Sequence, residues 1–145
     1  MAINNIPSIV KEFLILCKTE LELDQLPKII WLTQPSNFKS FGSFNPNDGS
    51  IRLVIVNRQI LDSLRTLAHE IVHYRQWTRD ELQPDSGETG SEQENEANSL
   101  AAVIMRKFGR SHPELFKMEP IAKSLIGRAI GGLSFFPEYN QLVVL

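Results

Sequence analysis

The sequence predicts an α+β fold in which a small antiparallel sheet with a hairpin packs on helices. The chain has 145 residues, of which 42% are hydrophobic and 22% charged, as expected for one globular domain with its own core. Its elements follow the order helix, strand, hairpin, helix, loop, helix, helix, an order typical of α+β proteins. We therefore expect residues 1–145 to form a single domain, with a core over about 28–108 and a helical extension over about 109–145.

The first elements are predicted to be a helix, a strand and a hairpin. Residues 8–21 carry apolar side chains at helical spacing and end before a proline, which predicts an amphipathic helix. Residues 28–32 are β-branched and aromatic, which predicts a strand. The turn sequence Asn45-Pro46-Asn47-Asp48-Gly49 lies between two alternating segments, so residues 38–56 are expected to form a β-hairpin.

The second half of the chain is predicted to be helical. Helical spacing runs over residues 60–77 and again over 91–108, where Gly109 is a candidate C-terminal cap. The polar residues 78–92 between these helices contain one proline and two glycines and are expected to form a long loop. A last helix is expected over residues 119–130.

Composition excludes several classes of protein. The net charge is −2, from 15 basic and 17 acidic residues, so nucleic-acid binding is not expected. Six basic residues between Arg106 and Arg128 are better explained by a solvated helix face than by a nucleic-acid patch. The single cysteine, Cys17, excludes an internal disulfide and a Cys-rich zinc ribbon. No segment reaches the roughly 18 apolar residues of a membrane span, and the N-terminus lacks the pattern of a signal peptide, which favours a cytoplasmic protein.

The sequence His69-Glu70-Ile71-Val72-His73 carries the chemistry. Histidines four residues apart lie on one face of a helix, so both imidazoles can reach one metal ion. Zinc suits them, because catalytic zinc sites use three protein ligands and a water. Glu70 lies beside such a water and is the candidate general base.

The third ligand is predicted to come from the helix over residues 91–108. The candidates on this helix are Glu92, Glu94 and Glu96, and His112, just before Pro113, is a further possible donor. Spacing alone leaves the choice open. Glu96 shares a helical face with Leu100 and Val103, which are expected to pack toward the first helix, and Glu92 lies one turn earlier on that face. Glu94 points about 200° away at the usual rotation per residue. We therefore favour Glu96, with Glu92 second.

The two helices resemble the motifs of small gluzincin metallopeptidases, the minigluzincins. The segment Thr66-Leu67-Ala68-His69-Glu70-Ile71-Val72-His73, with the later segment Glu96-Ala97-Asn98-Ser99-Leu100-Ala101-Ala102, is most similar to the ImmA/IrrE-like group. Residues 51–55 leading into Leu67-Ala68-His69 also resemble SprT-like metalloproteases. The resemblance spans about residues 28–106. It implies that His69, His73 and Glu96 bind Zn²⁺ and that Glu70 is the catalytic base. Arg106 replaces a proline common in that group, and no helix-turn-helix segment is evident, so substrate and regulatory role do not transfer.

The function expected from the sequence is zinc-dependent hydrolysis of a peptide bond. An extended peptide or protein substrate would lie along an exposed edge of the hairpin sheet. Weaker candidates for oxyanion binding are Tyr74, Gln76, His112 and Tyr139, of which Gln76 is also a candidate to support a metal ligand. The alternative is a catalytically idle protein that keeps the metalloprotease fold for assembly or regulation through protein–protein interaction. Oligomeric state is left open.

Overall fold

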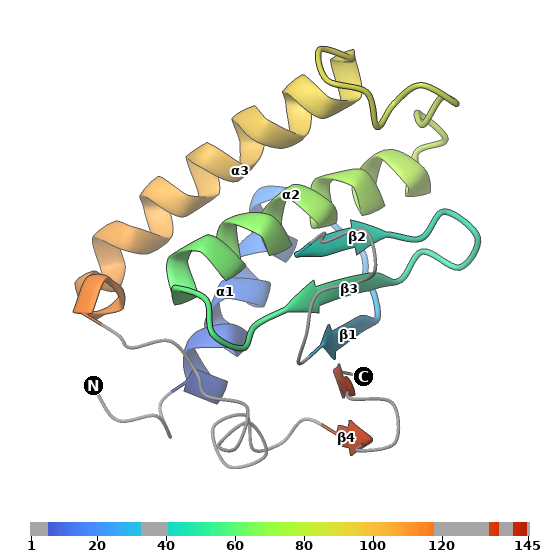
Figure 1. Cartoon of the computed structure of the whole chain (residues 1–145). Helices are drawn as coiled ribbons and strands as arrows, with labels where there is room; N and C mark the ends of the chain where they lie inside the picture. Colours follow the sequence, from blue (N-terminus) through green and yellow to red (C-terminus); the bar gives the residue numbers. More distant parts are fainter. Residues whose placement is uncertain (1–5, 33–40, 118–133, 137–140, 145) are drawn as a thin grey trace.

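The computed structural model describes residues 6–32, 41–117, 134–136 and 141–144, and Figure 1 shows their arrangement. Five strands form one sheet in the order β2-β3-β1-β5-β4. Their bounds are β1 Ile29–Leu32, β2 Gly42–Phe44, β3 Ile51–Val54, β4 Ser134–Phe136 and β5 Gln141–Val144. The predicted α+β class is confirmed.

The sheet is mixed, whereas the sequence predicted an antiparallel one. The hairpin of β2 and β3 is present and antiparallel, but β3 runs parallel to β1, with Ile29 opposite Ile51. The reason lies in which strand of the hairpin is buried. Three of the four β3 residues are buried, whereas no β2 residue is. The apolar β3 therefore lies inside the sheet beside β1, and β2 is left at the edge.

The C-terminal region also differs from the prediction of a purely helical extension. Strand β5 pairs antiparallel with β1, and β4 pairs antiparallel with β5, so the end of the chain completes the sheet. The phenylalanines of residues 134–136 and the apolar run over 142–144 have high strand propensity. The helix predicted over residues 119–130 lies outside the described residues.

Three α-helices and one short 3₁₀ helix are described: α1 Ile6–Glu20, α2 Ile60–Thr78, α3 Glu92–Ser111 and η2 Pro113–Lys117. The helices predicted over 8–21, 60–77 and 91–108 correspond to α1, α2 and α3. Gly109 does not cap α3 as predicted, because it is not among the described glycines with positive φ. Helix α3 continues through Gly109 and ends at Ser111. Pro113 disfavours helical backbone in the residue that precedes it, His112.

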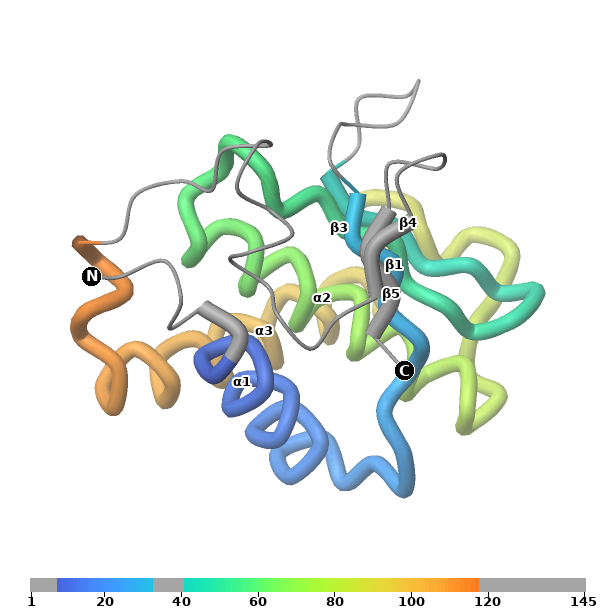
Figure 2. Tube along the Cα trace, turned by 90° about the horizontal axis from the view of Figure 1, so that it is seen from below, coloured from blue at the N-terminus to red at the C-terminus, as the bar shows by residue number. Residues whose placement is uncertain are grey.

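Helix α2 is the centre of the molecule. It packs against α3 on one side and against β2 and β3 on the other, and Figures 1 and 2 show it between the sheet and α3. Leu64, Leu67, Ala68 and Ile71 are fully buried, which fixes the rotation of α2 about its axis. None of the described helices combines the length and apolar composition needed to cross a lipid bilayer.

Candidate metal centre

Two histidines of α2 face one point. His69 and His73 lie one helical turn apart, and their Nε2 atoms are 3.1 Å apart. The buried apolar residues of α2 hold this arrangement, because Leu67, Ala68 and Ile71 turn into the core while the histidines turn toward the start of α3. His73 itself is only 8% exposed, so its ring has little room to rotate.

The third group at this point is Glu94. Its Oε1 lies 2.9 Å from His69 Nε2, and its Oε2 lies 3.1 Å from His73 Nε2. His69, His73 and Glu94 are together close enough to hold a metal ion. The carboxylate beside the histidines is therefore that of Glu94 and not that of the predicted Glu96, which accepts a hydrogen bond from Gln76 instead. Glu92, the second choice, is exposed and lies outside the cluster.

The phase of α3 explains why Glu94 takes this place. The buried residues of the helix are Ala97, Ala101, Ile104, Met105 and Phe108. Glu94 lies one turn before Ala97 and continues this stripe toward α2. Leu100 and Val103, which share a helical face with Glu96, are only half-buried. The face of α3 that contacts α2 is therefore rotated from the predicted face, toward Glu94 and away from Glu96.

The first turn of α3 is fixed by its N-cap. The Ser91 hydroxyl accepts a hydrogen bond from the Glu94 backbone N–H at 3.1 Å and donates one to Ser86 O at 2.7 Å. A serine N-cap satisfies a backbone donor that the helix itself leaves unpaired. Glu94 is thereby carried on ordered backbone, which is a requirement for a metal ligand.

The three groups lie close enough to hold one metal ion. Ligand atoms about 2.0–2.1 Å from a tetrahedral metal lie roughly 3.3 Å from one another. The two imidazole Nε2 atoms are 3.1 Å apart, and Glu94 reaches them with different oxygens, Oε1 at 2.9 Å from His69 and Oε2 at 3.1 Å from His73. One ligand atom from each residue gives a set within 4.8 Å. Imidazole nitrogen and carboxylate oxygen are both donors that a divalent transition metal accepts.

Gln76 fixes the orientation of the His73 ring. The amide Nε2 of Gln76 donates to Gln93 O and to Glu96 Oε1, both at 3.0 Å. Its Oε1 therefore faces His73 Nδ1, 2.8 Å away, and accepts the N–H of that nitrogen. The tautomer that results leaves the Nε2 lone pair of His73 directed at His69 and Glu94. Gln76 is 1% exposed, so these bonds are shielded from water.

Glu96 thus lies two hydrogen bonds away from the cluster, through Gln76. Its Oε1 accepts from Gln76 and lies 3.7 Å from the Arg75 guanidinium. The supporting role predicted for Gln76 matches this geometry, whereas no feature of the sequence indicates that Glu96 is the next contact beyond it.

The environment of His69 favours its neutral form. Burial lowers the pKa of His69 and the neighbouring His73 adds to this, while Glu94 and a hydrogen bond to the side chain of Asn98 oppose it. A neutral imidazole has the free lone pair that metal binding requires.

Glu70 is the other ionisable group at the site. Burial raises the pKa of Glu70 to about 7, with a further contribution from Glu94, while His73 acts in the opposite direction. Glu70 lines the same cavity as the three clustered residues. It is therefore a second carboxylate next to the cluster that is not itself part of it.

The cluster opens into a cavity of about 530 Å³. Edge strand β2 forms one wall with Gly42, Ser43 and Phe44, and the segment between α2 and α3 forms another with Leu82, Gln83, Pro84, Ser86 and Gly87. The second wall is held by Ser86, whose hydroxyl accepts from Gln83 N–H at 2.6 Å. The cavity is therefore a cleft between a strand edge and a folded loop, with the cluster on its floor.

The hairpin beside the cavity is attached to the end of α2. Trp77 Nε1 donates to Pro46 O at 2.9 Å, and the Trp77 ring makes an edge contact with Phe44 at 6.0 Å between centroids. Gly49 has a φ of +76°, and a Cβ there would lie 2.6 Å from the Trp77 ring. Only glycine suits this turn, which brings the hairpin onto Trp77.

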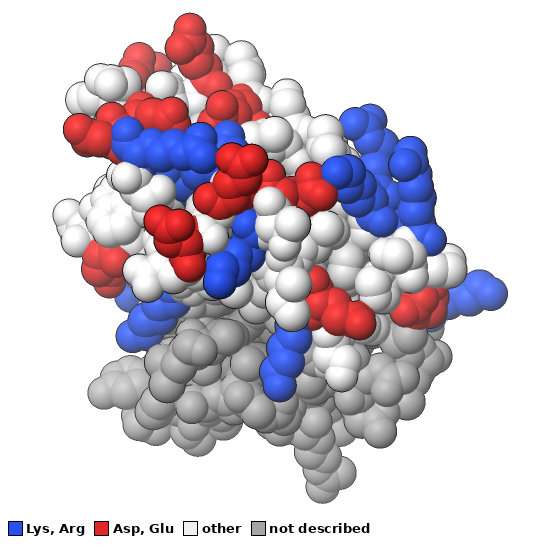
Figure 3. All heavy atoms as spheres, turned by 180° about the vertical axis from the view of Figure 1, so that it is seen from behind, with Lys and Arg blue, Asp and Glu red and all other residues white. Residues whose placement is uncertain are grey.

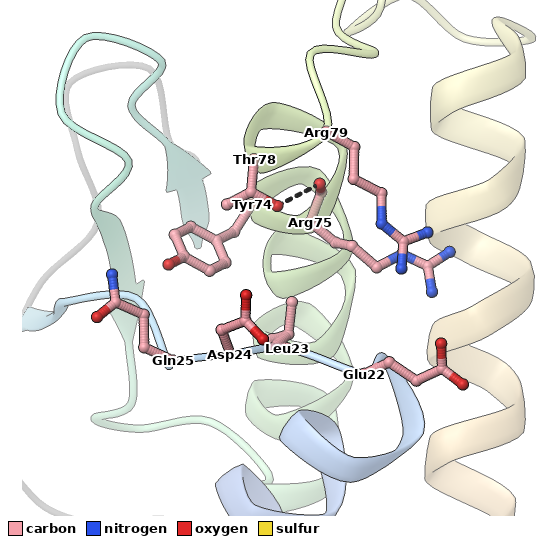
Figure 4. A pocket seen from close by; sticks show the side chains of 8 residues that line it. All are labelled: Glu22, Leu23, Asp24, Gln25, Tyr74, Arg75, Thr78 and Arg79. Carbon is pink, nitrogen blue, oxygen red and sulfur yellow. Dashed lines mark hydrogen bonds between the residues drawn. The ribbon is translucent and has the colours of Figure 1, made fainter.

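The other predicted site residues lie elsewhere. His112 stacks on Phe108 at 4.1 Å and bonds Glu12 at 2.7 Å, at the opposite end of α3 from Glu94. Tyr74 lines a separate polar cavity of about 400 Å³ between the α1–β1 connection and the end of α2 (Figure 4). Tyr139 lies outside the described residues.

Charge is distributed unevenly around the site. Figure 3 shows Asp and Glu side chains gathered over the segment between α2 and α3, and Lys and Arg side chains toward the end of α3.

Comparison of the chain with protein-family models, with curated proteins and with solved structures finds no match. The function is therefore inferred from the chemistry of the site.

Proposed function

We propose that this chain is a zinc-dependent metallopeptidase of gluzincin type, with His69, His73 and Glu94 as zinc ligands and Glu70 as general base. The observation that carries the proposal is the approach of Glu94, from a separate helix, to within 2.9–3.1 Å of both histidines of the HExxH sequence. Two imidazoles and one carboxylate with a cavity in front of them form the ligand set of a catalytic rather than a structural zinc site.

The donors favour zinc over the other common divalent ions. Imidazole nitrogen with a single carboxylate suits zinc, whereas magnesium and calcium prefer an all-oxygen set. A bound zinc ion would polarise the scissile carbonyl and lower the pKa of a coordinated water.

The residues around the cluster each have a task in the proposed reaction. Gln76 holds His73 in the tautomer that offers Nε2 to the metal. Glu70, on the cavity wall next to His69, takes the proton of the attacking water and returns it to the departing amine. Phe44 and Leu82 reduce the access of water to the reacting atoms from opposite walls.

The substrate proposed is an extended peptide. Strand β2 is the outermost strand on its side of the sheet and lies along the cavity. A peptide that adds to this edge by main-chain hydrogen bonds would pass over the cluster. The cavity walls are partly apolar, with Phe44, Pro46, Leu82 and Pro84, so an apolar side chain next to the scissile bond is favoured.

The test is cleavage of a peptide library by the zinc-loaded chain, read by mass spectrometry. We expect cleavage by the wild type and a loss of roughly 10²–10⁴-fold in Glu70→Gln, the usual contribution of a general base, with the zinc content unchanged. Glu88→Gln is the matched control, because Glu88 is exposed and does not line the cavity.

Two results would argue against the proposal. Equal cleavage by the wild type and Glu70→Gln would remove Glu70 from the mechanism. Zinc binding without cleavage of any library member would instead favour a non-catalytic protein that uses the same fold for assembly or regulation.

A further inference from the structure

A second cavity lies at the other end of α3 from the metal centre. It has a volume of about 530 Å³ and is formed by the first turns of α2, the C-terminal half of α3 and η2. Met105 lies eleven residues after Glu94, so at about 1.5 Å per residue the two sites are separated by about 16 Å along the helix. None of the residues that line this second cavity also lines the metal-centre cavity.

The floor of this cavity is apolar. Leu61, Ala102 and Met105 line it, and Phe116 stands at its side with 69% of its surface exposed. Phe116 is the most exposed large hydrophobic residue in the described part of the chain. An apolar floor beside an exposed aromatic ring is typical of a surface that another molecule covers.

The rim of the cavity is positive. It is formed by Arg65, Arg106 and Arg110, without an acidic residue among the lining residues. Arg65 has a loose exposed partner in Asp62 at 3.7 Å. Among the described residues no ion pair is formed by Arg106 or Arg110, although Lys107 on the same helix pairs with Glu20 at 2.8 Å.

Arg106 and Arg110 are also placed unfavourably with respect to each other. They are four residues apart on α3, where two like charges repel. The helix dipole favours Arg110 in the last turn, but it does not account for Arg106 or for the exposed Phe116. A bound anionic group would offset the repulsion, and an apolar group would cover the ring.

We infer that this cavity is a docking site for an acidic peptide segment of a partner protein, with one bulky apolar side chain placed between Met105 and Phe116 and flanking carboxylates paired with Arg106 and Arg110. Carboxylates pair with arginine in a bidentate manner, and an apolar anchor inside a charged rim is the usual arrangement of a peptide-binding hot spot. The apolar floor favours such a peptide over a nucleic-acid backbone, which would need the charges alone.

The test is selection of binders from a displayed library of twelve-residue peptides by the full chain, with affinities then measured by fluorescence polarisation. We expect the selected peptides to contain Asp or Glu around a Leu, Phe or Trp. We expect Phe116→Ser and the double variant Arg106→Gln/Arg110→Gln each to weaken binding at least tenfold. The control Lys11→Gln/Lys18→Gln changes two exposed basic residues of α1 and should leave the affinity unchanged.

Other outcomes would overturn the inference. These are selected peptides that lack acidic residues, affinities that the groove variants do not alter, or displacement of the peptide by single-stranded RNA at lower concentration than by a second acidic peptide. Binding measured in EDTA should equal binding in zinc, because the groove shares no residue with the metal cluster. Circular dichroism of each variant confirms that the fold is retained.

Discussion

Replacing Gln76 with leucine tests how the protein orients a metal ligand. The change removes the acceptor 2.8 Å from His73 Nδ1 and the donor to Gln93 O and Glu96, while it keeps a side chain of similar size in a site that is 1% exposed. His73 is then free to adopt the tautomer with its proton on Nε2, where the metal would bind. Loss of such an outer hydrogen bond typically lowers metal affinity about 10–100-fold, which corresponds to about 1.4–2.7 kcal/mol.

The folded state should also lose stability. Gln93 O and His73 Nδ1 lose their partner, and a buried polar group left without one costs about 1–3 kcal/mol. Zinc affinity is measured by competition with a chelating fluorophore, and the free energy of unfolding by urea denaturation in EDTA. Gln25→Leu is the matched control, because Gln25 is exposed and belongs neither to the cluster nor to the cavity in front of it.

A double variant separates orientation from packing. In Gln76→Glu/Glu96→Gln a carboxylate again accepts from His73 Nδ1, and the new amide at position 96 donates to it. This variant should bind zinc more tightly than Gln76→Leu. A zinc affinity of Gln76→Leu within twofold of the wild type would refute the assigned role of Gln76.

Three further predictions concern the fold and its titration. Burial, and to a lesser extent Glu20, raises the pKa of the Cys17 thiol far above its usual range. A thiol reagent should therefore modify Cys17 only as fast as the chain unfolds, because the thiolate is the reactive form. Rapid labelling of Cys17 in native buffer would contradict this prediction. Gly49→Ala should lower the free energy of unfolding by about 1–3 kcal/mol, because φ at Gly49 is positive and the Trp77 ring occupies the space that a Cβ would need. The control Gly87→Ala should leave the free energy of unfolding nearly unchanged, because no atom lies within 4 Å of a Cβ at that position. In metal-free protein the pKa of Glu70 is raised from 4.5 to about 7, so the folded state holds more protons between these values and stability should fall as pH rises through them. Glu70→Gln should remove that fall in thermal unfolding experiments, and an identical pH profile in both proteins would be inconsistent with the shifted carboxyl.

The helix that carries His69 and His73 is predictable because its apolar spacing is a local property of the sequence. The residue of α3 that meets these two histidines is not, because it depends on the rotation of α3 against α2. Leu100 and Val103 are as apolar as the residues that are in fact buried, and only the packing of Ala97 and Ala101 against the core selects Glu94. The spacing of these two small residues, one turn apart and in phase with Glu94, is the signal in the sequence for the correct face.

The sheet illustrates the same division between local and long-range information. The hairpin follows from its turn residues, but the parallel pairing of β1 with β3 depends on which strand the core covers. The pairing of β5 with β1 joins residues more than 100 positions apart in the chain. The hydrogen bonds from Gln76 to Gln93 and Glu96 likewise cross between two helices, so the sequence could suggest Gln76 as a supporting residue without identifying its partners.

The most direct test of the metal centre is the zinc content and zinc affinity of two single variants two residues apart. Glu94 contacts both histidines, whereas Glu96 contacts Gln76 and Arg75. We predict one zinc ion per chain in the wild type. Glu94→Gln should lower the zinc affinity at least about 100-fold, because it removes a charged ligand. Glu96→Gln should keep near wild-type zinc affinity, because its amide oxygen still accepts a hydrogen bond from Gln76. Wild-type zinc binding in Glu94→Gln together with its loss in Glu96→Gln would contradict the ligand set on which the proposed function rests.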